Sequence, residues 1–382
     1  MKRFLLAALV LFMVAGTAWA QDKCPMAKVE VSGYLAPNFR MIDKGEDVNS
    51  DLGFGLAFNR FTFAGMQEVG PIVKKIGWKV EADLPSTDSI DLIYAYVHAY
   101  FTEAISARFG HVKEAFGREW LHPTYNLLTA DRLITPLMAH EGLDYAGYSY
   151  GLELHLKQEM FSFVAGAYDG QGRESFVGDQ DPDLDFALRA AVNPMPELQI
   201  AGSLMLKSLP GEPGAFGWFH SPDDGTYLDD AEEYQTNSAM AWELDFDYQK
   251  AFSPTTSLWL QGEFGMGDNW ELGADDPAED DTWEDYEWFQ FQYFYVKALM
   301  MATKGFGVYL GFANWDPNTD SDLGENDGFS KIVPGIVYKW SDYTRTQAEV
   351  QLFTEQQGLD AEGDEVDDET YTNFVLQQVL VW

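Results

Sequence analysis

Apolar residues recur at every second position through most of the chain. Between residues 76 and 81, for example, Ile76, Trp78 and Val80 alternate with the charged residues Lys79 and Glu81. Successive side chains of a β-strand point to opposite faces, so this alternation predicts strands with one apolar and one polar face. Helical spacing of apolar residues is rare, and the chain is therefore expected to be all-β.

The alternation predicts sixteen strands along the chain. They are expected near residues 28–41, 52–66, 74–84, 90–102, 104–113, 142–157, 160–169, 183–193, 196–207, 237–250, 255–267, 286–301, 305–315, 328–340, 344–356 and 371–382. Two of them have an irregular pattern. The strand at 52–66 shifts its apolar face between Phe58 and Phe61, and the strand at 286–301 is apolar on both faces.

The connections between these strands roughly alternate in length. Short ones include 158–159, 193–196 and 302–304, whereas the long ones are 114–141, 170–182, 208–236, 268–285, 316–327 and 357–370. An even number of antiparallel strands with short periplasmic turns and long extracellular loops is typical of a transmembrane barrel. Hydrocarbon tolerates no unpaired strand edge, so such a sheet must close, and sixteen strands would enclose an aqueous channel.

The first twenty residues differ from the rest. Lys2 and Arg3 precede an apolar run, and Ala18 and Ala20 occupy the positions that a signal peptidase reads. We therefore expect a cleaved signal peptide at 1–20 and a single barrel domain at 21–382, located in the outer membrane of a Gram-negative cell. The aromatic end at Trp382 is typical of proteins that the barrel assembly machinery recognises.

The chain is strongly acidic, with 62 Asp and Glu against 24 Lys and Arg and a formal net charge of -38. This balance excludes binding to nucleic acid through a basic surface. Residues 268–287 and 357–370 contain many carboxylates and no Lys or Arg. They would concentrate cations and could bind Ca²⁺, although a solvated acidic surface is the simpler interpretation.

No motif for catalysis or for a cofactor is present. The sequence lacks H-E-x-x-H, G-x-S-x-G, a phosphate-binding loop and a haem-attachment motif, and its six histidines show no metal-ligand spacing. We expect no enzymatic activity, no bound cofactor and no resident metal.

The long connection at 114–141 is the main candidate for a functional segment. It mixes charged residues, including Arg118 and Arg132, with apolar residues that suit a short packed helix. In a large barrel such a loop can fold into the lumen, where low dielectric strengthens the field of its charges. An ordinary external loop is the alternative. On the wall, the strand phase places bases such as Arg40, Lys79 and Arg108 opposite the lipid-facing residues, together with many acids, so the lumen is expected to be mixed in sign.

The segment "RFGHVKEAFGREW" (108–120) resembles the phosphate-selective porin family. The family pattern G-x-x-K-x-P-F-G-x-E is matched at Gly110, Lys113, Phe116, Gly117 and Glu119, with Ala115 where the family often has Pro. The segments "FNRFTFAG" (58–65) and "GWKVEADL" (77–84) are also similar to that family. The resemblance covers roughly residues 52–140.

The resemblance implies a sixteen-stranded trimeric porin with an infolded third loop. Anion-specific members line the pore with arginines and lysines, whereas bases here are few and interleaved with acids. Lys113, Arg118 and, more loosely, Arg108 are the positions where the motif and the strand phase agree. The full set of expected pore-lining residues is Arg60, Lys79, Arg108, Lys113, Arg118 and Arg132.

The sequence thus favours a passive outer-membrane porin for small hydrophilic solutes or ions. It would be a homotrimer in contact with outer-membrane lipid and lipopolysaccharide. Two alternatives remain open: a barrel that sheaths electron-carrier proteins in a conduit, and a surface adhesin or cation-binding barrel that uses the acidic loops.

Overall fold

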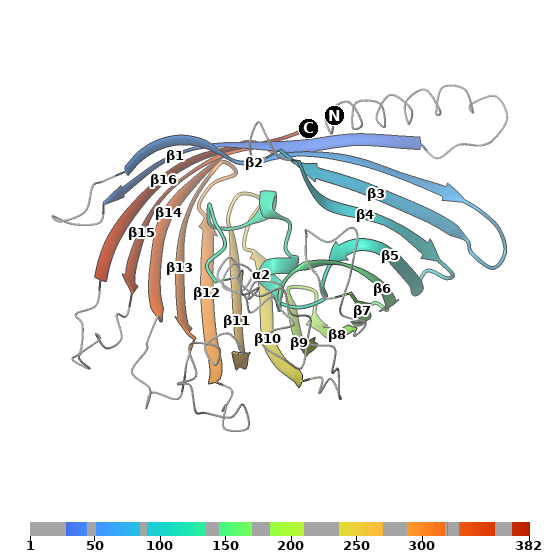
Figure 1. Ribbon diagram of the computed structural model, residues 1–382. Helices are drawn as coiled ribbons and strands as arrows, with labels where there is room; N and C mark the ends of the chain where they lie inside the picture. The colour runs from blue at the N-terminus through green and yellow to red at the C-terminus, as the bar shows by residue number, and fades with distance from the viewer. Residues whose placement is uncertain are drawn as a thin grey trace, which may run out of the picture.

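The protein is a closed antiparallel β-barrel, as a computed structural model shows (Figure 1). The structure describes residues 28–43, 51–84, 90–134, 145–169, 184–209, 237–269, 289–317, 319, 328–355 and 369–382. Within these ranges there are sixteen strands, each paired with its neighbours in sequence, and β1 pairs with β16 to close the sheet. The predicted fold class is confirmed, whereas the expected signal peptide at 1–20 lies outside the described residues.

The strand bounds follow the amphipathic pattern closely. The first eight strands are β1 (Lys28–Asp43), β2 (Asp51–Glu68), β3 (Lys75–Asp83), β4 (Asp91–Tyr100), β5 (Ile105–Lys113), β6 (Tyr148–Lys157), β7 (Phe161–Tyr168) and β8 (Asp185–Met195). The second eight are β9 (Leu198–Leu209), β10 (Asn237–Ala251), β11 (Ser257–Asn269), β12 (Phe289–Met301), β13 (Phe306–Asp316), β14 (Phe329–Ser341), β15 (Thr344–Glu355) and β16 (Glu369–Val381). Between β5 and β6 lie one helical turn, α2 (Arg118–Leu121), and a 3-10 turn, η1 (Thr124–Asn126).

The largest difference from the predicted bounds is at β6, which begins at Tyr148 and not near residue 142. Residues before it turn toward the chain that follows β5. The Gly147 N–H donates to Glu114 Oε2 at 3.0 Å, and the Ser149 hydroxyl donates to Glu114 Oε1 at 2.5 Å. The buried Glu114 carboxylate is thus satisfied by groups on either side of the first residue of β6.

Alternate residues of the strands face outward and into the lumen. On β10, Met240 and Leu244 are exposed on the outside, while Glu243 and Asp245 are buried inside the barrel. This arrangement places apolar side chains where hydrocarbon would lie and polar ones in the interior. No helix in the described part of the chain is long and apolar enough to cross a membrane.

The irregular phase of β2 has a structural cause. The pairing of β1 with β2 shifts by one residue, because Ala36 faces Phe58 and Pro37 faces Leu56. An extra residue in one strand is a β-bulge, which turns the side chains beyond it to the opposite face. Leu56 is accordingly exposed before the bulge and Phe61 after it.

The two apolar faces of β12 also have a cause. Its outer face exposes Phe294 and Val296, as expected for a lipid-facing surface. Its inner face packs against the chain that enters the barrel: the Phe291 and Tyr145 rings lie 5.5 Å apart between centroids. The strand thus contacts two apolar surroundings, which explains why its sequence does not alternate.

Close packing marks the seam between β1 and the end of the chain. The Gly33 N–H donates to the Trp382 carbonyl at 3.1 Å, and the Trp382 N–H donates back to the Gly33 carbonyl at 3.0 Å. A Cβ at position 33 would lie 2.6 Å from the Trp382 ring, so this position requires glycine.

Candidate functional site: the interior segment and the charged wall

Residues 114–134 run inside the barrel and are tied to its wall (Figure 1). At its far end the segment bonds to β15, where the Ala130 N–H donates to Glu349 Oε2 at 2.8 Å. Gln347 on the same strand donates to the Leu128 carbonyl at 2.9 Å. On β1, Arg40 donates to both carboxylate oxygens of Asp131, at 2.8 and 2.6 Å. The segment therefore crosses the lumen from β5 toward the β15 and β1 side.

Glu119 holds the middle of this segment. Its carboxylate accepts the backbone N–H of Leu133 at 2.8 Å and that of Ile134 at 3.1 Å, and it pairs with the Lys297 ammonium on β12. Both charged side chains are buried. Burial alone would raise the pKa of the Glu119 carboxyl, but the Lys297 charge and these hydrogen bonds hold the pKa below its ordinary value.

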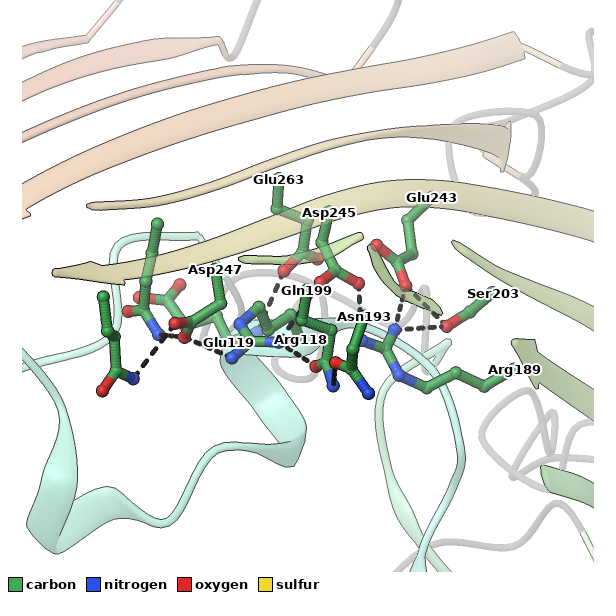
Figure 2. Close-up of polar contacts among 12 residues, drawn as sticks. Arg118, Glu119, Arg189, Asn193, Gln199, Ser203, Glu243, Asp245, Asp247 and Glu263 are labelled. Atoms are coloured by element: carbon green, nitrogen blue, oxygen red, sulfur yellow. Dashed lines mark hydrogen bonds and ion pairs between the residues drawn. The ribbon is translucent and has the colours of Figure 1, made fainter. Parts of the chain in front are cut away.

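Arg118 reaches from α2 to the wall formed by β9 and β10. Figure 2 shows its guanidinium among Gln199, Asp245 and Asp247. It donates to Gln199 Oε1 at 2.8 Å and to Asp245 Oδ1 at 3.4 Å, and it pairs with the Asp247 carboxylate. This predicted pore residue therefore faces acids on the wall.

Four carboxylates form what we call the acidic cluster: Glu243, Asp245, Asp247 and Glu263. Arg189 on β8 donates to Glu243 Oε1 at 2.5 Å and to Asp245 Oδ2 at 2.5 Å. Burying several carboxylates side by side is costly unless cations and hydrogen bonds compensate. Arg118 and Arg189 compensate Glu243, Asp245 and Asp247, whereas Glu263 accepts from the Tyr293 and Tyr295 hydroxyls.

Arg132, the second arginine expected in the pore, bonds within the segment itself. Its Nε donates to the Glu119 carbonyl at 3.1 Å, and its Nη2 donates to the His122 carbonyl at 3.3 Å and the Thr124 hydroxyl at 3.2 Å. Its guanidinium also lies 5.0 Å from the centroid of the Trp120 ring. Arg132 thus stabilises the conformation of the segment, whereas Arg118 contacts the barrel wall.

Lys113, at the end of β5, is likewise a structural contact. Its ammonium donates to the Trp120 carbonyl at 2.5 Å and lies 4.9 Å from the centroid of the Trp120 ring. The side chain is buried.

The remaining three predicted residues lie on β2, β3 and β5, and each pairs with a wall carboxylate. Arg60 donates to Asp83 at 2.7 Å, and Lys79 lies 2.7 Å from Glu81. The Arg108 Nε donates to Glu153 at 2.5 Å. Four of the six, Arg60, Lys79, Lys113 and Arg132, lie close enough for their charges to interact, whereas Arg118 faces β9 and β10.

Water reaches the interior wall at a limited set of charged side chains. The exposed fraction is 36% for Arg40, 26% for Lys79 and 22% for His155. By contrast, Lys297 on β12 is almost fully buried. Partly exposed charges therefore occur on β1, β3 and β6 beside buried ones such as Arg60 and Glu153, and the segment contacts β12 and β15.

Two residues that hold the interior segment, Lys297 and Asp247, were not among the expected pore-lining residues. Lys297 is the one charge between Gln292 and Met301 in the strand that is apolar on both faces, and that isolation was a usable signal. Asp247 continues the alternation of Glu243 and Asp245 on β10 and could have been included by phase alone.

The described residues contain no group of three or more His, Cys, Asp or Glu side chains placed to hold a metal ion. Most of the acidic stretch at 268–287 and of that at 357–370 lies outside the described residues. The expectation of Ca²⁺ binding there stays a prediction.

No family profile and no curated protein matches this chain. Solved structures do match it. OprB from Pseudomonas putida superimposes with a TM-score of 0.64 at 9% identity, covering 97% of this chain and 97% of that chain. An anion-selective porin from Comamonas acidovorans gives a TM-score of 0.63 at 13% identity, covering 94% and 100%. The trimer form of OmpT from Vibrio cholerae gives 0.57 at 13% identity, covering 93% and 99%.

The chain shares the fold of outer-membrane porins. Identities this low establish the fold alone. The narrower resemblance to phosphate-selective porins, drawn from residues 52–140, is not confirmed.

Proposed function

We propose that this protein is an outer-membrane porin through which small hydrophilic solutes or ions diffuse passively. The observation that carries the proposal is the interior segment: residues 114–134 narrow a sixteen-stranded barrel without removing water from the wall at Lys79 and His155. A barrel of this size encloses more space than its own side chains fill. A tethered segment within it would act as a sieve.

The charge arrangement supports a weakly selective channel and not a phosphate-specific one. A phosphate site needs cations that are free to bind the anion. Here Arg60, Lys79 and Arg108 each face a wall carboxylate, and Arg118 faces two. The lumen is mixed in sign, and its paired charges would bias small ions without capturing them.

The same interior segment is unfavourable to the sheath hypothesis. An electron-carrier protein would need the space that residues 114–134 occupy, and Glu119 and Asp131 tie that segment to β12 and β1. The adhesin or cation-binding hypothesis depends on acidic loops outside the described residues and stays a prediction.

The proposed setting is the outer membrane of a Gram-negative cell. The exposed apolar outer face would contact outer-membrane lipid and lipopolysaccharide. A homotrimer is proposed because one structural neighbour is described as a trimer form. Recognition of the Trp382 end by the barrel assembly machinery, cleavage after residue 20, and the absence of enzymatic activity, of a cofactor and of nucleic-acid binding belong to the same proposal.

Planar-bilayer recording tests the proposal directly. Protein purified from outer membranes is added to a bilayer that separates two KCl concentrations. Stepwise conductance with a defined reversal potential is expected. Folded, heat-modifiable protein that inserts and conducts nothing would contradict a porin.

A further inference from the structure

The inner face of β4 carries aromatic side chains at every position over most of its length. Tyr94, Tyr96, His98 and Tyr100 alternate with smaller lipid-facing residues such as Ala95 and Val97. Consecutive ring centroids lie 5.9, 6.5 and 4.2 Å apart. The four rings therefore form a continuous row, which we call the β4 row.

This row connects the interior segment to the end of the barrel with short turns. At the end of the row nearer the interior segment, the centroids of the Tyr94 and Tyr148 rings lie 5.8 Å apart. The centroids of the Tyr148 and Trp120 rings lie 5.0 Å apart, and Trp120 belongs to the interior segment. At the other end of the row, Tyr100 precedes the turn at 101–104. A solute that passes the interior segment would meet these rings in order.

The β4 row differs from the aromatic residues of the β12 and β13 wall. Phe291 and Trp315, on β12 and β13, are fully buried and stack 5.3 Å apart, so they serve as packing. The rings of the β4 row are only partly buried, on the side of the barrel where water reaches Lys79 and His155. Lys79 lies over the Tyr94 ring, Arg108 lies over the Tyr96 ring, and His98 stacks on Tyr100, so a ligand would contact the ring surface that these groups leave uncovered.

Hydrogen-bonding groups border the row on both sides. On β3, Lys79 and Glu81 pair at 2.7 Å, and Lys79 lies 4.2 Å from the Tyr94 ring centroid. On β5 and β6, Arg108 pairs with Glu153, which also contacts His155 at 2.9 Å. Both carboxylates are buried, so the groups that the borders expose are the donors Lys79, Arg108 and His155.

We infer that the β4 row is a binding track for saccharides. A sugar ring presents C–H groups on its faces, which pack on aromatic rings, and hydroxyl groups at its edge, which need donors and acceptors together. The partly exposed tyrosines of the row supply the rings and hydroxyl groups that can accept or donate, and Lys79, Arg108 and His155 supply further donors. The inference rests on the proposed porin function and adds a solute class to it.

Other small solutes fit these residues less well. A phosphorylated or carboxylated solute would meet cations that carboxylates already neutralise. An aromatic acid would stack on the rings, but its charge would lie beside Glu81 or Glu153. A neutral polyhydroxylated ring satisfies both the rings and the borders.

The test is a bilayer recording of the full-length protein with maltotriose as the probe and sodium benzoate as the comparison. Maltotriose is expected to reduce the open-channel current in a saturable way. Tyr96→Ala and Tyr100→Ala are each expected to weaken this binding by about five- to tenfold, in line with the loss of one stacked ring. Two variants are used so that the result does not depend on the folding of either one.

Tyr371→Ala is the matched control. Tyr371 lies on β16, where its ring stacks on Phe353 at 4.5 Å, and it has no contact with the β4 row. The substitution removes the same side chain from another wall, so maltotriose binding is expected to stay at the wild-type value.

Three outcomes would overturn the inference. If the channel conducts and maltotriose leaves its current unchanged, the saccharide track is contradicted and the porin function is supported. Block by benzoate but not by maltotriose would replace the solute class. If the folded protein does not conduct, maltotriose binding is measured by calorimetric titration in detergent. Binding that Tyr96→Ala weakens would support the saccharide track but not the porin function. No binding would contradict both proposals.

Discussion

Lys297 on β12 pairs with the Glu119 carboxylate of the interior segment, across 178 positions of sequence. Both side chains are buried, and the same carboxylate accepts two backbone N–H groups from Leu133 and Ile134. The Glu119 side chain thus connects α2 to the barrel wall at β12 and to the backbone at Leu133 and Ile134.

Removing the cation should loosen the interior segment. Lys297→Met leaves the Glu119 carboxylate buried without its counter-charge, which typically costs ~3–5 kcal/mol. We expect a lower temperature for heat modification on electrophoresis and a larger, noisier single-channel conductance.

Two further variants serve as controls for the Lys297→Met result. In Glu119→Gln combined with Lys297→Met, no uncompensated charge remains, so part of the lost stability should return. Lys250→Met removes a lysine whose pair with Glu197 is solvent-exposed, and it should change stability little. Equal losses in Lys297→Met and Lys250→Met would show that the buried pair does not anchor the segment.

Arg118 should control ion selectivity. Arg118→Gln removes the cation that faces Asp245 and Asp247, so the acidic cluster becomes less neutralised. The reversal potential in a KCl gradient should shift toward that of a cation-selective channel, and Arg118→Glu should shift it further. An unchanged reversal potential in both variants would place Arg118 away from the ion path.

Arg132 provides the comparison for that experiment. It bonds to the carbonyls of Glu119 and His122 within the segment. Arg132→Gln is therefore expected to lower the heat-modification temperature and to change selectivity less than Arg118→Gln does. The reverse order of the two selectivity shifts would contradict the assigned roles.

Gly110 should not tolerate a side chain. Its φ of 129° lies in a region that L-residues rarely adopt, and a Cβ would lie 2.8 Å from the Tyr96 Cα. We expect Gly110→Ala to reduce the yield of heat-modifiable barrel. Gly53→Ala is the control, because a Cβ there meets nothing within 4 Å. Normal folding of both variants would show that the strand at Gly110 can relax.

His122 should make the barrel less stable in acid. Burial, reinforced by the nearby Arg118 charge, lowers the pKa of His122 to about 4. In the unfolded chain the pKa is near ~6.5, so the unfolded state binds more protons between these values. Stability should rise with pH through this window and fall as the pH drops from ~6.5 toward 4.

Thermal unfolding of His122→Gln at several pH values tests that expectation. Glutamine cannot take up the proton, so the loss of stability on acidification should be smaller than in the wild type. Both proteins should behave alike above pH ~7. An equal acid dependence would mean that His122 is protonated in the folded barrel.

The strands could be predicted from sequence because their signal is local and repeated. Each strand must place apolar residues outside and polar residues inside, so a period of two marks every one of them. The two irregular patterns also correspond to structural features. The phase shift near Phe58 marks the bulge opposite Ala36 and Pro37, and the apolar inner face of β12 is the surface that contacts Tyr145.

The contacts of the interior segment could not be predicted in this way. Arg118 and Arg132 lie in the same stretch and have the same chemistry, yet one faces Asp247 on the wall and the other bonds to the Glu119 carbonyl. What separates them is the path of the chain in three dimensions, which depends on partners far away in sequence, such as Lys297 and Glu349. No local period encodes such pairings.

The seam between β1 and β16 has a consequence for how the barrel forms. Met41 pairs with Phe374, and Gly33 with Trp382, so the two strands farthest apart in the chain complete the ring. Contacts between such distant residues are slow to form, because the intervening chain must be arranged first. Until β16 docks, β1 keeps one row of backbone groups unpaired, which hydrocarbon does not accommodate. In the proposed membrane setting, the β1–β16 pairing completes the backbone hydrogen bonding of the ring, and an assembly intermediate would have to keep its open edge shielded until that strand arrives.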